Sequence, residues 1–182
     1  MRDLASPVVA MARLFVCVWP DAAVCEDLRA LHRKDQPGVR FVPEANWHVT
    51  LRFLGHAEPR HVAEALADVR VNPTDVTIGP VVELLSDHSV IVAAQGLDEW
   101  AAAVARATAG LGDSPPRHRF RGHVTLARLS GRARRMGSAR PGLLGTPVAT
   151  GFRATELALV VSHLHPGGAR YDTLATFPAD AP

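Results

Sequence analysis

The tetrapeptide His-Val-Thr-Leu occurs twice in the chain, at residues 48–51 and 123–126. Histidine accounts for 9 of the 182 residues, so the repetition of one histidine context singles out these two copies. Alternate side chains of an extended strand share a face. The sequence therefore predicts that His48 points the same way as Thr50, and that His123 points the same way as Thr125.

Two imidazoles and two hydroxyls at one site suit the hydrolysis of a phosphate ester. One imidazole can take the proton of the attacking water while the other protonates the leaving oxygen, since both titrate near neutral pH. The threonine hydroxyls can donate hydrogen bonds to the non-bridging phosphate oxygens, where negative charge accumulates. Such a site needs no metal ion.

Several alternatives compete with a catalytic pair. A single His-x-Thr on a strand is more often an incidental surface or packing pair, and only its repetition favours catalysis. A metal centre is a second alternative, but no histidine has the carboxylate spacing of His-Glu-x-x-His. No serine lies in a Gly-x-Ser-x-Gly nucleophile motif, and Cys17 and Cys25 are expected to be reduced thiols. The further histidines considered as ligands are His56, His61, His118, His163 and His165.

Basic charge is concentrated in one part of the chain. No acidic residue occurs between Ser114 and Thr155, and Lys34 is the only lysine of the protein. A positive zone of this kind attracts phosphate groups, although arginine is also the default surface cation of this chain. The arginines of the acid-free block are Arg117, Arg119, Arg121, Arg128, Arg132, Arg134, Arg135, Arg140 and Arg153.

The elements expected around the two motifs form an α+β protein. Strands are predicted over 13–19, 74–85, 88–95, 119–129, 152–164 and 170–178, and helices over 21–33, 58–70 and 97–111. The segment 39–55 is expected to contain a short strand, a bend with a proline and a second strand that carries the first motif and ends at Gly55. We expect residues 1–182 to form a single domain of two pseudo-symmetric lobes, with mostly antiparallel sheet, helices on the outer faces and a central cleft. No apolar segment reaches the length of a membrane span, so a cytoplasmic protein without membrane contact is predicted.

Four segments resemble one known family. The segments "WHVTLRFLG" (47–55) and "RFRGHVTLAR" (119–128) resemble the two signatures of the two-histidine (2H) phosphoesterases. Within that superfamily they resemble the bacterial and archaeal RNA 2′,3′-cyclic phosphodiesterases, also called 2′-5′ RNA ligases. "RLFVCVWPD" (13–21) and "SHLHPGGARYDTLATFP" (162–178) are similar to the first strand and the closing hairpin of that family. The resemblance covers nearly the whole chain and implies the 2H phosphoesterase fold.

The resemblance also implies roles for individual residues. His48 and His123 match the catalytic pair, with His48 assigned as general acid and His123 as general base. Thr50 and Thr125 match the phosphate-binding hydroxyls. Arg128 matches an arginine close to the phosphate. Strand alternation alone would point it away from His123, so its placement depends on the resemblance or on a local twist.

Three aromatic residues are candidates for contacts to the nucleobase or the ribose: Phe53, Phe120 and Tyr171. Strand alternation puts Phe53 on the apolar side, which favours a place in the core. The chain departs from the family pattern at three positions, with Gly122 in place of proline, Trp47 in place of leucine and His163 in place of arginine. Gly122 is expected to loosen the approach to His123.

The predicted function is the metal-independent hydrolysis of RNA 2′,3′-cyclic phosphate ends to 2′-phosphomonoesters. We expect a monomer that needs no cofactor and that binds RNA ends or related cyclic nucleotides. The alternatives are a phosphodiesterase acting on small cyclic nucleotides or ADP-ribose cyclic phosphate, the reverse 2′-5′ ligation, and a non-catalytic RNA-binding module.

Overall fold

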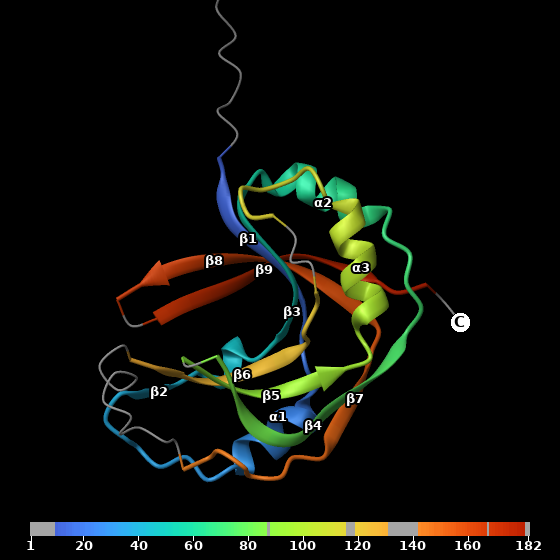
Figure 1. Ribbon diagram of the computed structural model, residues 1–182. Coiled ribbons are helices and arrows are strands. Elements are labelled where there is room, and N and C mark those ends of the chain that lie inside the picture. Colours follow the sequence, from blue (N-terminus) through green and yellow to red (C-terminus); the bar gives the residue numbers. More distant parts are fainter. Residues whose placement is uncertain (1–9, 87, 116–118, 131–141, 167, 181–182) are drawn as a thin grey trace, which may run out of the picture.

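A single antiparallel sheet dominates the computed structural model, which describes residues 10–86, 88–115, 119–130, 142–166 and 168–180. Eight of its nine strands follow the order β7-β4-β5-β6-β3-β1-β8-β9, and the ninth, β2, lies beside β6 (Figure 1). The strands are β1 (Ala12–Val18), β2 (Val39–Phe41), β3 (Val49–Ala57), β4 (Thr74–Leu85), β5 (Ser89–Gln95), β6 (His123–Leu129), β7 (Thr150–Ala154), β8 (Glu156–His165) and β9 (Gly168–Pro178).

The described residues also form three α-helices and one short 3-10 helix: α1 (Ala22–Ala30), α2 (Pro59–Ala67), α3 (Asp98–Ala107) and η1 (Glu44–Asn46). Local sequence accounts for two of the helix starts. The Asp21 carboxylate accepts a hydrogen bond from the Val24 amide at 2.9 Å, and Glu58 caps α2 through two backbone amides. These side chains satisfy amide groups that lack a partner in the first turn.

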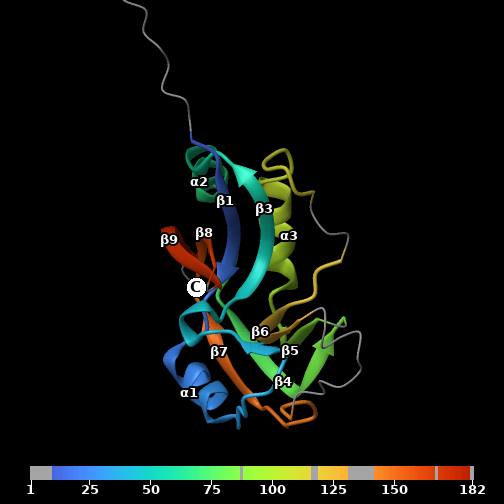
Figure 2. The same ribbon diagram turned by 90° about the vertical axis from the view of Figure 1, so that its left-hand side faces the viewer.

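The helices lie at two ends of the sheet. In Figures 1 and 2, α2 and α3 lie near β1 and β3, while α1 lies beside β7. The hydroxyl of Thr150 in β7 donates a hydrogen bond to Asp27 in α1. Because α1 follows β1 in the chain but packs near β7, the chain crosses between the two halves of the sheet.

Both faces of β1 are covered. Leu14, Val16 and Val18 belong to the main hydrophobic core, whereas Phe15 and Cys17 belong to a second, smaller cluster with residues of β8. This division follows from strand alternation, since successive side chains point to opposite faces. The second cluster lies on the side of the sheet that carries His48, whose ring centroid lies 4.8 Å from that of Phe15.

The α+β class and the antiparallel sheet are confirmed, with differences in detail. The strand expected over 152–164 is two strands, β7 and β8, separated at Thr155. The two strands separate because their partners differ: β7 pairs with β4 and β8 pairs with β1. These partners, β4 and β1, lie four places apart in the sheet order. The helices α1, α2 and α3 all end three or four residues earlier than expected. The two-lobed arrangement with a central cleft stays a prediction. Among the described residues, no helix is both long and apolar enough to cross a membrane.

Candidate active site

The two halves of the sheet meet where the repeated motifs pair. β3 and β6 are antiparallel and share one residue pair, Val49 with Val124, and both valines are completely buried. An antiparallel register centred on equivalent residues relates the two motifs by an approximate two-fold axis. One residue to either side, His48 lies across from Thr125. In the same way, Thr50 lies across from His123, so all four side chains share the face opposite the valines.

A β-bulge in β6 brings Arg128 to this face. Thr125 pairs with Ile91 and Arg128 pairs with Ser89, so three residue steps of β6 match two of β5. Side chains of paired residues lie on the same face, and an extra residue in one strand reverses the alternation beyond it. Strand alternation alone would direct Arg128 away from His123, and this bulge is the local irregularity that brings it to the histidine face.

The first motif contains the same irregularity. Thr50 pairs with Cys17 and Phe53 pairs with Phe15, so three steps of β3 match two of β1. Phe53 thus joins the face of Thr50, and 36% of its surface is exposed. The expected core position of Phe53 is wrong for the same reason. Phe53 and Arg128 occupy equivalent positions of the two motifs, five residues after each histidine.

Arg52, which follows the first motif directly, points to the opposite face. Its guanidinium donates hydrogen bonds to the Ala105 carbonyl (3.1 Å), the Thr108 hydroxyl (2.9 Å) and the Leu111 carbonyl (3.2 Å). Only 5% of Arg52 is exposed, and its burial lowers its pKa. Arg52 therefore anchors the C-terminal end of α3 to β3, away from the histidines.

Each histidine is oriented by its own backbone. Nδ1 of His48 lies 2.7 Å from the Asn46 carbonyl oxygen, and Nδ1 of His123 lies 2.8 Å from the Arg121 carbonyl oxygen. A carbonyl oxygen can only accept, so Nδ1 carries the hydrogen in both rings. In the neutral ring Nε2 is then the nitrogen that can accept a proton.

Aromatic rings surround His48. The ring centroids of Phe15, Tyr171 and Trp19 lie 4.8, 5.3 and 5.6 Å from that of His48. Burial lowers the pKa of His48 to about 4, assisted by the charges of His123 and Arg128 and opposed by the hydrogen bond to Asn46. His48 is therefore neutral at pH 7 in the unliganded protein.

Arg128 is held close to this histidine. Its Nη1 donates a hydrogen bond of 2.7 Å to the hydroxyl of Ser89, a residue that is 2% exposed. The positive charge of Arg128 contributes to the lowered pKa of His48. The contact with Ser89 could not be read from the sequence because it depends on the pairing of β5 with β6.

Two other arginines of the acid-free block form ion pairs with acids of other segments. Arg121 lies 3.0 Å from Glu83, and Arg153 lies 2.9 Å from Asp75. Arg119 is exposed. The remaining members of the block, Arg117, Arg132, Arg134, Arg135 and Arg140, lie outside the described residues.

The three aromatic candidates lie in different places. Tyr171 in β9 contacts the rings of His48 and Phe15, whereas Phe120 packs against the main core. The guanidinium of Arg13 lies over the Phe53 ring, 4.7 Å from the ring centre. Arg13 in turn donates a hydrogen bond of 2.9 Å to Ser162. The sequence pattern did not single out Arg13 as a site residue; its only signal was the interruption of an otherwise apolar run.

The three residues at which the chain departs from the resemblance make defined contacts. The Ala94 amide donates to the Gly122 carbonyl at 2.9 Å, and a Cβ on Gly122 would lie 2.4 Å from the Ala94 carbonyl oxygen. Gly122 thus allows a close approach of β5 immediately before His123, in contrast to the expected loosening. Trp47 is buried beneath Arg33, and His163 lies 3.2 Å from Asp172.

The histidines considered as metal ligands that the structure describes do not form a cluster. His56 pairs with Asp113 and His61 pairs with Glu58, while His118 lies outside the described residues. Within the described ranges no group of three or more histidine, cysteine or acidic side chains could hold a metal ion.

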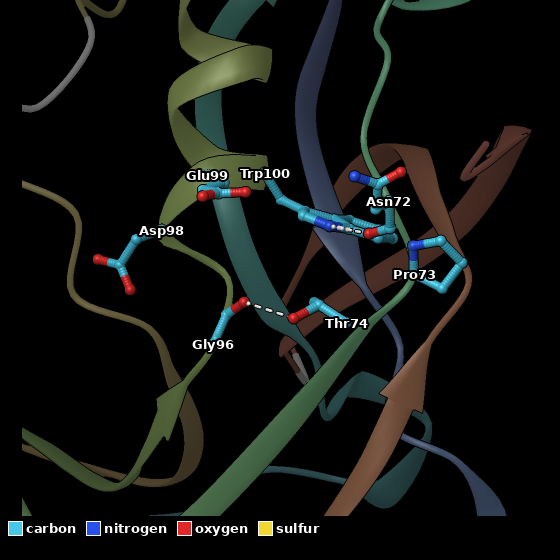
Figure 3. A pocket seen from close by; sticks show the side chains of 7 residues that line it. All are labelled: Asn72, Pro73, Thr74, Gly96, Asp98, Glu99 and Trp100. Carbon is cyan, nitrogen blue, oxygen red and sulfur yellow. Dashed lines mark hydrogen bonds between the residues drawn. The ribbon is translucent and has the colours of Figure 1, made fainter. Parts of the chain in front are cut away.

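A separate pocket of about 360 Å³ lies at the start of α3 (Figure 3). Its lining includes Asp98, Glu99 and Trp100 from α3, with Thr74 and Gly96 across from them. The Thr74 hydroxyl donates to the Gly96 carbonyl at 3.2 Å. Neither motif histidine lines this pocket, and its carboxylates make it unsuited to a phosphate.

Comparisons with known proteins found a matching family model and similar structures. Residues 18–82 match the family model described as LigT like Phosphoesterase. Escherichia coli LigT complexed with 3'-AMP has a similar structure, with a TM-score of 0.75 and 23% identity over 94% of this chain and 100% of the other. The protein TT0787 of Thermus thermophilus gives a TM-score of 0.72 and 22% identity over 91% and 97%. The search of curated proteins found no match.

Proposed function

We propose that the chain is a phosphoesterase of the LigT-like family, whose model matches residues 18–82, and that it hydrolyses RNA 2′,3′-cyclic phosphate ends to 2′-phosphomonoesters without a metal ion. The observation that carries this proposal is the paired arrangement of His48 and His123. Both imidazoles occupy equivalent positions on one face, each with Nδ1 bound to a backbone carbonyl. Each Nε2 is thereby assigned to proton transfer, which suits one acid and one base.

The proposed reaction is a displacement at phosphorus. A water molecule attacks the cyclic phosphate as one histidine takes its proton, and the bond from phosphorus to the ribose O3′ breaks. The second histidine protonates O3′, which leaves a 3′-hydroxyl and a 2′-phosphomonoester. Thr50 and Thr125 donate hydrogen bonds to the non-bridging oxygens, and Arg128 balances their negative charge.

The roles of the two histidines are part of this proposal. His123 is assigned as base toward water and His48 as acid toward O3′. Burial keeps His48 neutral in the unliganded protein. An acid role therefore requires the bound phosphodiester anion to raise the pKa of His48, as a nearby opposite charge does. If His48 stays neutral with phosphate bound, the two roles are exchanged.

The substrate class rests on the surroundings of the pair. Phe53 and Tyr171 present aromatic rings on the same side as His48, and such rings can stack on a nucleobase or border a ribose. Phe120 packs against the core, which gives it less opportunity for such a contact. The similar Escherichia coli LigT has been obtained complexed with 3'-AMP and with ATP, which supports a nucleotide substrate.

Incubation of the purified protein with oligoribonucleotides that end in a 2′,3′-cyclic phosphate tests this function. We expect a 2′-phosphomonoester product, identified against the 3′ isomer by chromatography, and equal rates with and without a chelator. Nucleoside 2′,3′-cyclic phosphates, ADP-ribose cyclic phosphate and 2′-5′ ligation substrates are assayed in parallel. Chelator-sensitive activity that added Zn²⁺ or Mn²⁺ restores would contradict the mechanism.

Replacement of either histidine tests the pair directly. We expect His48→Ala and His123→Ala each to lower kcat/KM by roughly 10²–10⁴-fold, the usual contribution of a general acid or base. Circular dichroism must show that both variants are folded. His163→Ala is the matched control, since this histidine pairs with Asp172 in the β8–β9 hairpin. A folded variant at either motif histidine that retained activity would remove that histidine from the mechanism.

A further inference from the structure

A second arginine lies beside Arg128 on the face of the histidines. Arg40 in β2 pairs directly with Arg128 in β6. Directly paired residues of antiparallel strands have Cβ atoms about 4.5–5.5 Å apart and point to the same face. The β-bulge that brings Arg128 to the face of Thr125 and His123 therefore brings Arg40 there as well.

The two arginines place like charges opposite each other without compensation. Arg128 donates to the neutral hydroxyl of Ser89, and within the described residues neither Arg40 nor Arg128 has an acidic partner. Directly opposed like charges destabilise a sheet. A bound anion between the two guanidinium groups would relieve this repulsion. By contrast, the exposed arginines Arg121 and Arg153 are neutralised by Glu83 and Asp75.

The guanidinium of Arg40 also reaches toward the hairpin that covers His48. A Cβ on Gly168 would lie 3.5 Å from Nη1 of Arg40, which places this nitrogen against the β8–β9 turn. The next residue, Ala169, accepts a hydrogen bond of 2.7 Å from Asn46, whose own carbonyl holds His48. Tyr171 of the same hairpin contacts the His48 ring. Arg40 thus borders the site but lies one strand beyond Arg128.

We propose that Arg40, together with Arg128, binds the phosphodiester that joins the terminal nucleotide to the rest of an RNA strand. This inference rests on the proposed function, because it assumes that the reacting phosphate lies between His48 and His123. Arg128 then lies between two successive phosphates, and Arg40 contacts the more distant one. Arg40 is accordingly a specificity residue that favours RNA ends over free nucleoside cyclic phosphates.

Hydrolysis of two matched substrates tests the role of Arg40: a dinucleotide ending in a 2′,3′-cyclic phosphate, and the corresponding nucleoside 2′,3′-cyclic phosphate, which lacks the second phosphate. We expect Arg40→Gln to lower kcat/KM about tenfold on the dinucleotide, the scale of one charge-assisted phosphate contact. On the mononucleoside the change should stay below about twofold. Arg153→Gln removes the same charge far from the site and should leave both rates unchanged.

Equal losses on both substrates would overturn the proposal, because Arg40 would then act on the reacting phosphate or on the fold. Unchanged rates on both would overturn it too. A binding measurement separates this inference from the proposed function. The probe is an oligoribonucleotide with a terminal 2′-phosphate, titrated over a range of salt concentrations. Arg40→Gln should reduce the log–log salt slope by about 0.7, the value for one phosphate of a single strand. This readout does not require any hydrolysis, and an unchanged slope would also contradict the assignment.

Discussion

His48 and His123 share a sequence context and a backbone arrangement. Both have Nδ1 bound to the carbonyl of the residue two positions earlier. His48 in addition lies among three aromatic rings, contributed by β1, β9 and the segment after β1, and its burial lowers its pKa. Repeated motifs can thus form a symmetric backbone arrangement while tertiary packing sets the acidity of an individual histidine.

The low pKa of His48 predicts how stability depends on pH. The imidazole has a pKa near 6.5 when unfolded and about 4 when folded, so the unfolded chain binds a proton more readily. This contribution to stability is complete above pH 6.5 and is lost as the pH falls toward 4. The loss amounts to roughly 2–3 kcal/mol at about pH 4.5. Urea unfolding of the wild type and of His48→Gln at neutral pH and at this lower pH measures it.

The variant His48→Gln cannot titrate at this position, and all other ionisable groups are common to both proteins. We expect its stability to fall less than that of the wild type between the two pH values. Equal losses would show that His48 is protonated as easily in the folded state as in the unfolded state. Nuclear magnetic resonance of the His48 ring with and without inorganic phosphate then shows whether a bound anion raises the pKa as an acid role requires.

The threonines provide a second test at single positions. Thr50→Val and Thr125→Val preserve the side-chain shape and remove one hydrogen-bond donor each. We expect each to raise the activation free energy by about 1–3 kcal/mol, measured as a decrease in kcat/KM, because a phosphate oxygen loses a partner. Thr173→Val, at an exposed position of β9, is the control. Wild-type rates in both motif variants would exclude the hydroxyls from phosphate binding.

Among the elements, the bulged strands β3 and β6 determine which side chains reach the site. Each has an extra residue directly after the motif threonine, so the fifth residue after each histidine returns to the histidine face. This places Phe53 on one side of the site and Arg128 on the other. Arg52, which directly precedes Phe53, is directed to the opposite face and holds α3.

The contact between β5 and the start of β6 is predicted to be sensitive to one methyl group. Gly122→Ala would bring a Cβ to 2.4 Å from the Ala94 carbonyl oxygen, so the strands must separate. We expect a loss of about 1–3 kcal/mol of stability, as for other overpacked sites, together with lower activity because His123 is the next residue. Urea unfolding and kcat/KM measure the two effects.

Gly110→Ala is the matched control for this substitution, since a Cβ there has no neighbour within 4 Å. It should be close to neutral in both assays. Unchanged stability and rate in Gly122→Ala would mean that β5 and β6 tolerate a wider separation than the structure shows. In that case, glycine at this position would not be required for the placement of His123.

For the molecule as a whole, the charge distribution predicts salt-dependent binding of RNA. Arg128 and Arg40 lie on the histidine face, whereas Arg121 and Arg153 are neutralised elsewhere. Binding of an oligoribonucleotide should weaken as salt rises, because each neutralised phosphate of a single strand contributes roughly 0.7 to the log–log slope. Removal of Arg121 and Arg153, which already have acidic partners, should therefore alter this slope little.

The double variant Arg134→Ala/Arg135→Ala tests the part of the acid-free block that lies outside the described residues. If both arginines contact phosphates, the slope falls by about 1.4, twice the value for one phosphate. Arg121→Ala/Arg153→Ala removes the same charge from positions with acidic partners and serves as control. The same slope in both double variants would assign residues 134 and 135 to ordinary surface charge.

The features that the sequence predicted correctly are those set by neighbours along the chain. Alternation within the motifs pairs His48 with Thr50 and His123 with Thr125, and Asp21 caps the helix expected after the first strand. The resemblance of the two motif segments to those of the 2H phosphoesterases extended this interpretation to the fold of that family. The long-range features were not predictable in this way. The faces of Phe53 and Arg128 depend on bulges that exist only relative to partner strands, and alternation alone misplaced both residues.

The low pKa of His48 and the opposition of Arg40 to Arg128 likewise come from packing between distant segments. Desolvation of His48 requires rings of β1 and β9, which lie near opposite ends of the chain. The partner of Arg40 is set by the register of β2 with β6. Register is a property of two strands together, and a shift of one residue would turn every side chain to the other face. The types of the candidate site residues can therefore be read from the sequence, while their acidity and their neighbours come from the assembled sheet.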